Sequence, residues 1–203
     1  LVDSIMVMMN VPIAVSVHTV VSWIFGMTIR PMWHSTVLGP YFVVGAIFSG
    51  IAAIIIAMAI LRKVYHFEGY LKPIHFNYLG LLLLTMTSMW FYFTLCEYLT
   101  TGYGALPEEW EVFESKVVGE FSVLFWIMMA CMTIAFFRLL LCRKWAIGAT
   151  VTASAFIVVG MWIERYTIVV PTLMKLSGRG YEAGMYYPSW VEWSITAASF
   201  CGF

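Results

Sequence analysis

Charged residues are scarce in this sequence. Aspartate, glutamate, lysine and arginine make up 11% of the 203 residues, whereas soluble domains carry about 25%. Hydrophobic residues make up 62%, and the mean hydropathy is +0.89. This composition predicts an integral membrane protein. The formal net charge is zero, so the sequence gives no electrostatic reason to expect a nucleic-acid partner.

Patterns for binding metal or haem are also lacking. Of the four histidines, only His18 lies deep in an apolar segment, so it has no second histidine at the same depth to share a b-type haem. The cysteines lie far apart, without the spacing of metal ligands, and we interpret them as small buried side chains: Cys96, Cys131, Cys142 and Cys201. We therefore expect no haem, no iron–sulfur cluster and no metal ligand in this chain.

Long apolar segments are abundant. A membrane helix needs about 20 such residues, and five segments qualify: 5–27, 40–61, 74–99, 117–141 and 145–170. A sixth begins near Trp190. Because lipid cannot satisfy free backbone groups, these segments predict an all-α bundle of transmembrane helices. Since both ends of the chain look like cuts, we expect residues 1–203 to be part of one larger helical domain, with preceding and following helices missing.

The distribution of basic residues predicts the orientation. The loop 62–73 and the short link after the fourth span are basic, so we expect both on the inner side. The segment 102–116 carries four glutamates and one lysine. We expect it to be a loop on the outer side, together with the loops 28–39 and 172–188.

Ionisable side chains inside a span are candidates for function, because a charge in the bilayer costs several kcal/mol. His18 lies in the middle of the first span, and Glu97 lies near the outer end of the third. Glu164 and Arg165 are adjacent in the fifth, where Arg165 lies about 9 Å below a helix end at Pro171. Neighbouring helical residues point about 100° apart, so one of the two should face a cavity while the other pairs elsewhere. Purely structural roles for all four residues stay open, but a lone imidazole suits proton transfer.

Two further patterns predict packing. Gly45 and Ser49 are four residues apart, a spacing that lets helix backbones approach closely. Tryptophan and tyrosine gather near the presumed outer borders of the spans, among them Trp33 and Tyr41. Such residues are typical of anchors at the membrane–water interface.

Several motifs carry a resemblance to a known family. They are an S-V-H helix, a P-x-W-H-S loop, a P-Y-F-x-x-G-A-I-F-S-G helix and a G-M-W-x-E-R-x-x-I-V-V segment, at residues 16–18, 31–35, 40–50 and 160–170. With them the chain resembles the NrfD-like membrane subunits of the polysulfide-reductase family. Within that family it is most similar to the large membrane subunits of alternative complex III. The resemblance covers nearly the whole sequence.

The resemblance implies a function. Members of the family bind quinol, such as menaquinol, near the outer face of the inner (plasma) membrane. They pass electrons to an iron–sulfur partner subunit on that side. In alternative complex III the electrons continue to multihaem cytochrome c subunits, and the paralogous membrane subunits are linked to proton translocation. The resemblance thus implies one subunit of a quinol:electron-acceptor oxidoreductase of a respiratory or photosynthetic chain, surrounded by lipid.

The resemblance also suggests roles for particular residues, although it assigns no catalytic one. By the match, Trp23, Ile24 and Arg165 would lie at the quinol pocket. His18, Glu97 and Glu164 would lie on or near a proton route.

Ile24 departs from the family pattern. Many quinol-binding relatives carry an aspartate there, and an apolar side chain cannot accept a quinol proton. The alternative is therefore a paralogous scaffold or proton-conducting subunit that does not bind quinol. A secondary transporter is a weaker alternative, since such proteins use interrupted helices at mid-membrane and Pro12 is the only proline deep in a predicted span.

Overall fold

The computed structural model describes residues 2–28, 30–141, 146–174 and 188–201, and every regular element in these ranges is a helix. In order they are α1 (Val2–Gly26), α2 (Leu38–Val64), the 3-10 turn η1 (Phe67–Gly69), α3 (Pro73–Gly104), α4 (Pro107–Val117), α5 (Ser122–Leu141), α6 (Ala146–Met174) and α7 (Trp190–Cys201). Five of them, α1, α2, α3, α5 and α6, are long and apolar enough to cross a membrane. The predicted all-α membrane fold is confirmed, and each of the five predicted spans overlaps one of these helices.

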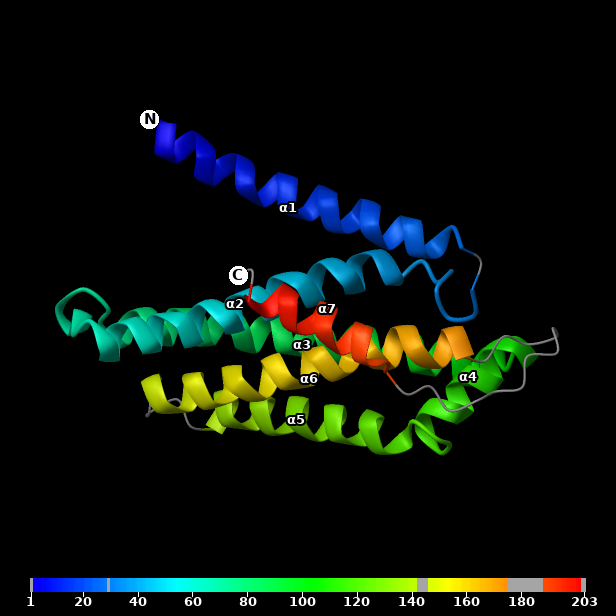
Figure 1. Cartoon of the computed structure of the whole chain (residues 1–203). Helices are drawn as coiled ribbons and strands as arrows, with labels where there is room; N and C mark the ends of the chain where they lie inside the picture. Colours follow the sequence, from blue (N-terminus) through cyan, green and yellow to red (C-terminus); the bar gives the residue numbers. More distant parts are fainter. Residues whose placement is uncertain (1, 29, 142–145, 175–187, 202–203) are drawn as a thin grey trace.

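Four of the spans form the body of the protein. Helices α2, α3, α5 and α6 lie side by side, whereas α1 packs only against α2 among the described elements and diverges from it toward the N-terminus (Figure 1). Buried positions recur every seven residues, which is two helical turns and therefore one helix face. They are Phe48 and Ile55 on α2, Phe76, Leu83 and Trp90 on α3, Phe125, Met132 and Leu139 on α5, and Thr150, Ile157, Glu164 and Pro171 on α6.

Small residues allow close contact between these helices. Gly45 of α2 is buried against α6, and a Cβ atom there would collide with the Arg165 guanidinium and lie 3.1 Å from the Met161 methyl group. Gly80 of α3 faces Thr150 of α6 in the same way, with a Cβ-to-Oγ1 distance of 3.0 Å. The packing role predicted for Gly45 is therefore confirmed.

The two ends of the bundle carry different segments. The segment 30–37, α4 and the last turn of α6 lie together at one end, and the loop 62–73 lies at the other (Figure 1). We name the first the outer end and the second the inner end, after the orientation that the basic residues predict. An ion pair of 3.0 Å between His34 and Glu109 joins the segment 30–37 to α4. The predicted shared face is confirmed for these segments. Residues 142–145 and 175–187, which include parts of the predicted link, fifth span and last loop, lie outside the described residues.

Three predicted boundaries are wrong. The segment 102–116 is not a loop, because α3 continues to Gly104 and α4 follows at Pro107. A proline at the first position and two glutamates in the first turn favour this helix start. The span predicted from residue 117 consequently begins at Ser122. Finally, α6 continues through Pro171 to Met174, which places Arg165 about 14 Å from the helix end.

The opposite placement of the two ends predicts a labelling pattern. We expect a membrane-impermeant maleimide added from the outer side of sealed vesicles to label Glu108→Cys on α4 but not Glu68→Cys in the loop 62–73. Glu68→Cys should react only after the membrane is opened. The parent protein gives the background of the native cysteines. Labelling of both positions from one side would contradict the fold, and labelling of Glu68→Cys alone would reverse the orientation.

Candidate functional site

A buried carboxylate joins three helices near the outer half of the bundle. Glu164 occupies one of the seven-residue core positions of α6, and only 2% of it is exposed. The Tyr41 hydroxyl of α2 and the Trp90 indole N–H of α3 both donate hydrogen bonds to its Oε1 atom. Its other oxygen, Oε2, has no hydrogen-bond partner among the described residues. The carboxylate is thus half satisfied in an otherwise apolar core.

Arg165 is the next residue of α6, and its side chain lies beside this carboxylate. Its guanidinium stacks over the Phe42 ring, 4.4 Å from the ring centroid, which is a cation–π contact. Its Nη2 atom lies 3.7 Å from Glu164 Oε2, and its Nη1 atom is buried without a partner among the described residues. The prediction that one of the two faces a cavity while the other pairs elsewhere is wrong for the cavity between α1, α2 and α3, because neither residue lines it. Instead the arginine side chain returns toward the Glu164 carboxylate.

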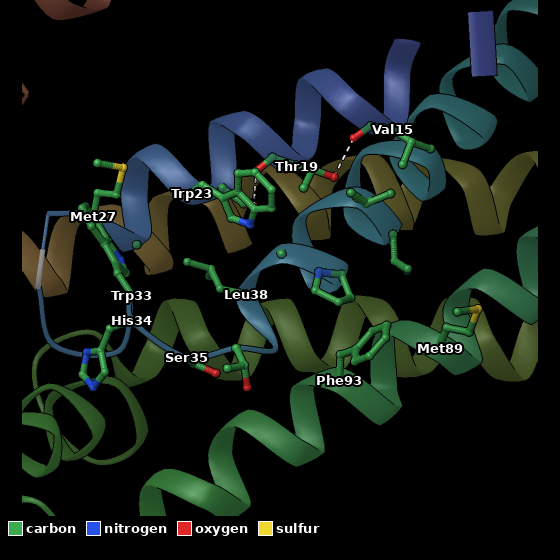
Figure 2. Close-up of a pocket in the computed structure, with 17 residues that line it drawn as sticks. Val15, Thr19, Trp23, Met27, Trp33, His34, Ser35, Leu38, Met89 and Phe93 are labelled. Carbon is green, nitrogen blue, oxygen red and sulfur yellow. Dashed lines mark hydrogen bonds between the residues drawn. The ribbon is translucent and has the colours of Figure 1, made fainter. Parts of the chain in front are cut away.

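A cavity of about 810 Å³ lies between α1, α2 and α3. Figure 2 shows Thr19 and Trp23 of α1 on one side and Met89 and Phe93 of α3 on the other. The walls along the helices are mainly apolar, while polar side chains from the segment 30–37 line the outer end: His34, Ser35 and Thr36. The cavity is therefore amphiphilic, and its polar end is the one nearer to α4.

The predicted pocket residues are divided between two flanks of α2. Trp23 lines the cavity, whereas Ile24 and Arg165 do not. Ile24 follows Trp23 by one residue and points about 100° away, where 59% of it is exposed. Arg165 lies on the other flank, since it contacts Gly45 and Phe42, which are on the face of α2 away from its cavity-lining residues.

His18 is likewise separate from the cavity. It precedes Phe25 by seven residues, which places both on the same face of α1. Its ring nitrogen Nδ1 lies 2.7 Å from the Ala14 carbonyl oxygen of its own helix. The structure does not bring His18 together with Glu97 or Glu164, although all three were predicted on a proton route.

Glu97 belongs to a polar cluster at the outer end of the cavity. Ser35 lines the cavity, and its side chain lies in the neighbourhood of the Glu97 carboxyl group. Lys116 of α4 is 4% exposed, and its Nζ atom lies 3.6 Å from the Met32 sulfur. Burial lowers the pKa of Lys116 from its usual 10.5 to about 8, against an opposing effect of the Glu97 carboxylate. The ion pair of His34 and Glu109 closes the cluster toward the surface.

Two aromatic residues have roles that the sequence analysis missed. Trp33 and Tyr41 were predicted as interface anchors, and this prediction is wrong. Trp33 is 5% exposed and donates its indole N–H to the Ile168 carbonyl of α6 at 3.1 Å, while Tyr41 donates to Glu164. Trp90 and Lys116 were not singled out as functional residues at all.

The described residues contain no group of three histidine, cysteine, aspartate or glutamate side chains placed to hold a metal ion. Cys96 and Cys131 are free thiols. The ionisable groups that are present suit proton transfer and hydrogen bonding to an uncharged polar ligand.

The comparisons with known proteins define the family. The sequence model of the family described as "Polysulphide reductase, NrfD" matches residues 2–177, and the chain therefore belongs to this family. Its members are membrane subunits of quinol-linked oxidoreductase complexes, in which they work with iron–sulfur and electron-transfer subunits. This chain is accordingly a multi-pass membrane protein. Comparison with individual curated proteins finds no match.

The contacts of Glu164 predict a specific loss of stability. Tyr41→Phe removes one hydrogen bond to a buried carboxylate, and such bonds to charged groups contribute about 1.5–3 kcal/mol. We expect a lower thermal unfolding midpoint for the purified protein in detergent. Tyr78→Phe is the matched control, because Tyr78 lies on α3 and is 64% exposed. Equal midpoints for the two variants would show that the bond to Glu164 does not stabilise the bundle.

Proposed function

We propose that this chain is the quinol-binding membrane subunit of a quinol-oxidising electron-transfer complex, and that the cavity between α1, α2 and α3 is the quinol site. The observation that supports this most directly is the shape and polarity of the cavity. Its apolar walls run along the helices, and its outer end carries the polar side chains of His34, Ser35 and Thr36. A coarser version of this function follows from family membership.

The cavity matches the chemistry of a quinol. A quinol has a ring with two hydroxyl groups and a long apolar tail, and ligand sites combine apolar walls with a few placed polar groups. The tail would lie along Val15, Val44 and Met89. The ring would lie near the outer end, with a hydroxyl group facing Ser35 or His34.

Quinol oxidation also needs an electron acceptor. We propose that electrons leave to an iron–sulfur partner subunit docked on the outer end of the bundle, and from there pass to multihaem cytochrome c subunits in a complex like alternative complex III. In that arrangement the protein lies in the inner (plasma) membrane, next to a paralogous NrfD-like subunit. Protons leave the ring at the cavity end that carries Ser35.

Ile24 and Arg165 take different places in this proposal. Ile24 points away from the cavity, so the missing carboxylate at this position does not remove a proton acceptor from it. Arg165 acts as a positioning residue through a row of aromatic rings. It stacks on Phe42, Phe42 packs on Phe25, and Phe25 meets Trp33 at 4.9 Å, edge to face, where Trp33 forms part of the cavity wall.

A second function has its own supporting observation. The hydrogen-bonded group of Glu164, Tyr41 and Trp90 is separate from the cavity residues. A paralogous scaffold or proton-conducting subunit could use this group without binding quinol. The two functions differ in whether the cavity holds quinone.

Filling the cavity tests the proposed function. We expect Thr19→Trp to block the cavity and to raise the KM for quinol, or lower quinol turnover, by at least about tenfold, a loss of about 1.4 kcal/mol of binding. Val17→Trp is the matched control, because Val17 lies on α1, is 53% exposed and does not line the cavity. The measurement is steady-state quinol oxidation by the intact complex, with assembly checked for both variants. Equal kinetics in the two variants would favour the scaffold function.

Changes at Arg165 test the aromatic row. Lysine keeps the charge but loses the planar guanidinium that stacks on Phe42. We therefore expect Arg165→Lys to weaken quinol oxidation and Arg165→Met to weaken it more, while the complex still assembles. Unchanged turnover in an assembled Arg165→Met complex would exclude a role for this residue in quinol oxidation.

A further inference from the structure

We infer that the inner end of the bundle carries a binding site for the phosphate group of an anionic phospholipid, between the end of α2 and the start of α6. A cavity of about 430 Å³ lies there. It shares no lining residue with the cavity between α1, α2 and α3. The inference therefore does not rest on the proposed quinol site.

The end of α2 supplies basic side chains to this inner cavity. Arg62 and Lys63 lie in the last turn of α2, and both line the cavity. The chain then turns at His66, where the backbone is left-handed with a φ of 53°, and this residue lines the cavity as well. The start of α6 lies at the same end of the bundle and forms the opposite wall (Figure 1).

Arg62 has a hydrogen-bond donor that the protein does not use. Its Nε atom is buried and has no hydrogen-bond partner among the described residues. The ion pairs found among those residues, His34 with Glu109 and Arg165 with Glu164, do not involve it. A buried N–H group without an acceptor costs free energy. A phosphate oxygen would supply the acceptor, and the planar guanidinium group suits phosphate better than any other side chain does.

The start of α6 adds backbone donors on the other side of the cavity. Helix α6 begins at Ala146, so Gly148 lies in its first turn, where the N–H groups have no partner within the helix and carry a partial positive charge. Gly148 lines the cavity, and a Cβ atom there would meet no other atom within 4 Å. The backbone is thus open to an approaching anion.

The charges around the cavity are mainly positive. Arg138 of α5 donates a hydrogen bond of 2.9 Å to the Thr152 hydroxyl, which lines the cavity. The carboxylate of Glu68 also lines it, but this residue is exposed and forms no ion pair with the basic side chains. Arg62, Lys63 and Arg138 therefore outweigh one negative charge.

The rest of the lining favours a lipid over a soluble phosphate. Ala59, Ile147 and Val151 line the same cavity, and they belong to two helices that are long and apolar enough to cross a membrane. A phospholipid presents its phosphate where such helices end and its acyl chains beside them, and basic pockets between transmembrane helices bind anionic headgroups. Basic residues at an inner helix end also follow from topology alone. Topology does not require a buried Nε atom or an open helix start.

Lipid binding by the purified intact complex tests the site. Native mass spectrometry in a neutral detergent gives apparent Kd values for dioleoylphosphatidylglycerol, which is anionic, and dioleoylphosphatidylcholine, which is zwitterionic. We expect the anionic lipid to bind at least about fivefold more tightly, the factor that one basic residue contributes near a lipid surface. Arg62→Gln should remove this preference. Lys72→Gln is the matched control, because Lys72 is exposed on the same loop and does not line the cavity.

A variant on the opposite wall covers a failure of Arg62→Gln to assemble. Gly148→Glu brings a negative charge to the cavity without a clash, and an acidic side chain in the first turn favours the helix itself. It should abolish the preference for the anionic lipid. Gly104→Glu is the control, because a Cβ atom there also meets nothing within 4 Å and Gly104 lies at the outer end of α3.

Three results would overturn the inference. One is equal affinity of the parent complex for the two lipids. Another is an unchanged preference for the anionic lipid in an assembled Arg62→Gln or Gly148→Glu complex. The third is displacement of the bound phosphatidylglycerol by inorganic phosphate, which would assign the cavity to a soluble phosphate. Quinol turnover enters none of these measurements, so they leave the proposed function to its own test.

Discussion

The buried carboxylate of Glu164 is the interaction on which the arrangement of the helices depends. An unpaired polar group in the core costs several kcal/mol in a bilayer, where no water can replace a lost partner. Tyr41 and Trp90 supply its hydrogen bonds from two other helices. Helices α2, α3 and α6 must therefore place these three side chains at the same depth. Each helix must also be rotated about its own axis so that its side chain points toward the other two. Because this constraint fixes the rotation of α2, it also fixes the direction of the opposite face, which packs against α1 and lines the cavity.

At the outer end of the protein, side-chain contacts hold the elements together. At the inner end, α1 is separate from the other helices. Trp33 anchors the segment 30–37 to α6, and the ring contacts through Phe25 and Phe42 connect α1 to Arg165. Toward its N-terminus α1 leaves the bundle (Figure 1). The cavity lies where this divergence begins. A rigid polar end and an open apolar side suit a ligand that enters from the membrane with its ring toward the outer face.

Much of this architecture can be predicted from the sequence. The five spans follow from the long apolar segments, because the bilayer thickness sets a minimum helix length. The burial of Glu164 could also have been predicted, since it continues the seven-residue register of Thr150 and Ile157 on α6. In the same way, Trp90 and Glu97 continue the register of Phe76 and Leu83 on α3. These side chains share one helix face, and that pattern is visible in the sequence.

Other features could not be predicted, for physical reasons. Helix α4 is short and strongly charged, so its composition resembles that of an exposed loop. The burial of Lys116 depends on contacts between α3, α4 and the segment 30–37, which no local pattern encodes. Trp33 and Tyr41 lie at a depth where aromatic residues face either the lipid interface or the core, and sequence does not distinguish the two. The separation of His18 from the cavity depends on which face of α1 is turned toward α2, and the sequence does not determine this.

The most direct measurement is a cryo-electron microscopy map of the whole complex with a bound quinone analogue. The account predicts ring density in the cavity between α1, α2 and α3, with a ring oxygen within hydrogen-bond distance of Ser35 or His34 and the tail along Met89. Ring density beside Arg165 on the other flank of α2, or only in a sister subunit while this cavity holds lipid, would contradict it.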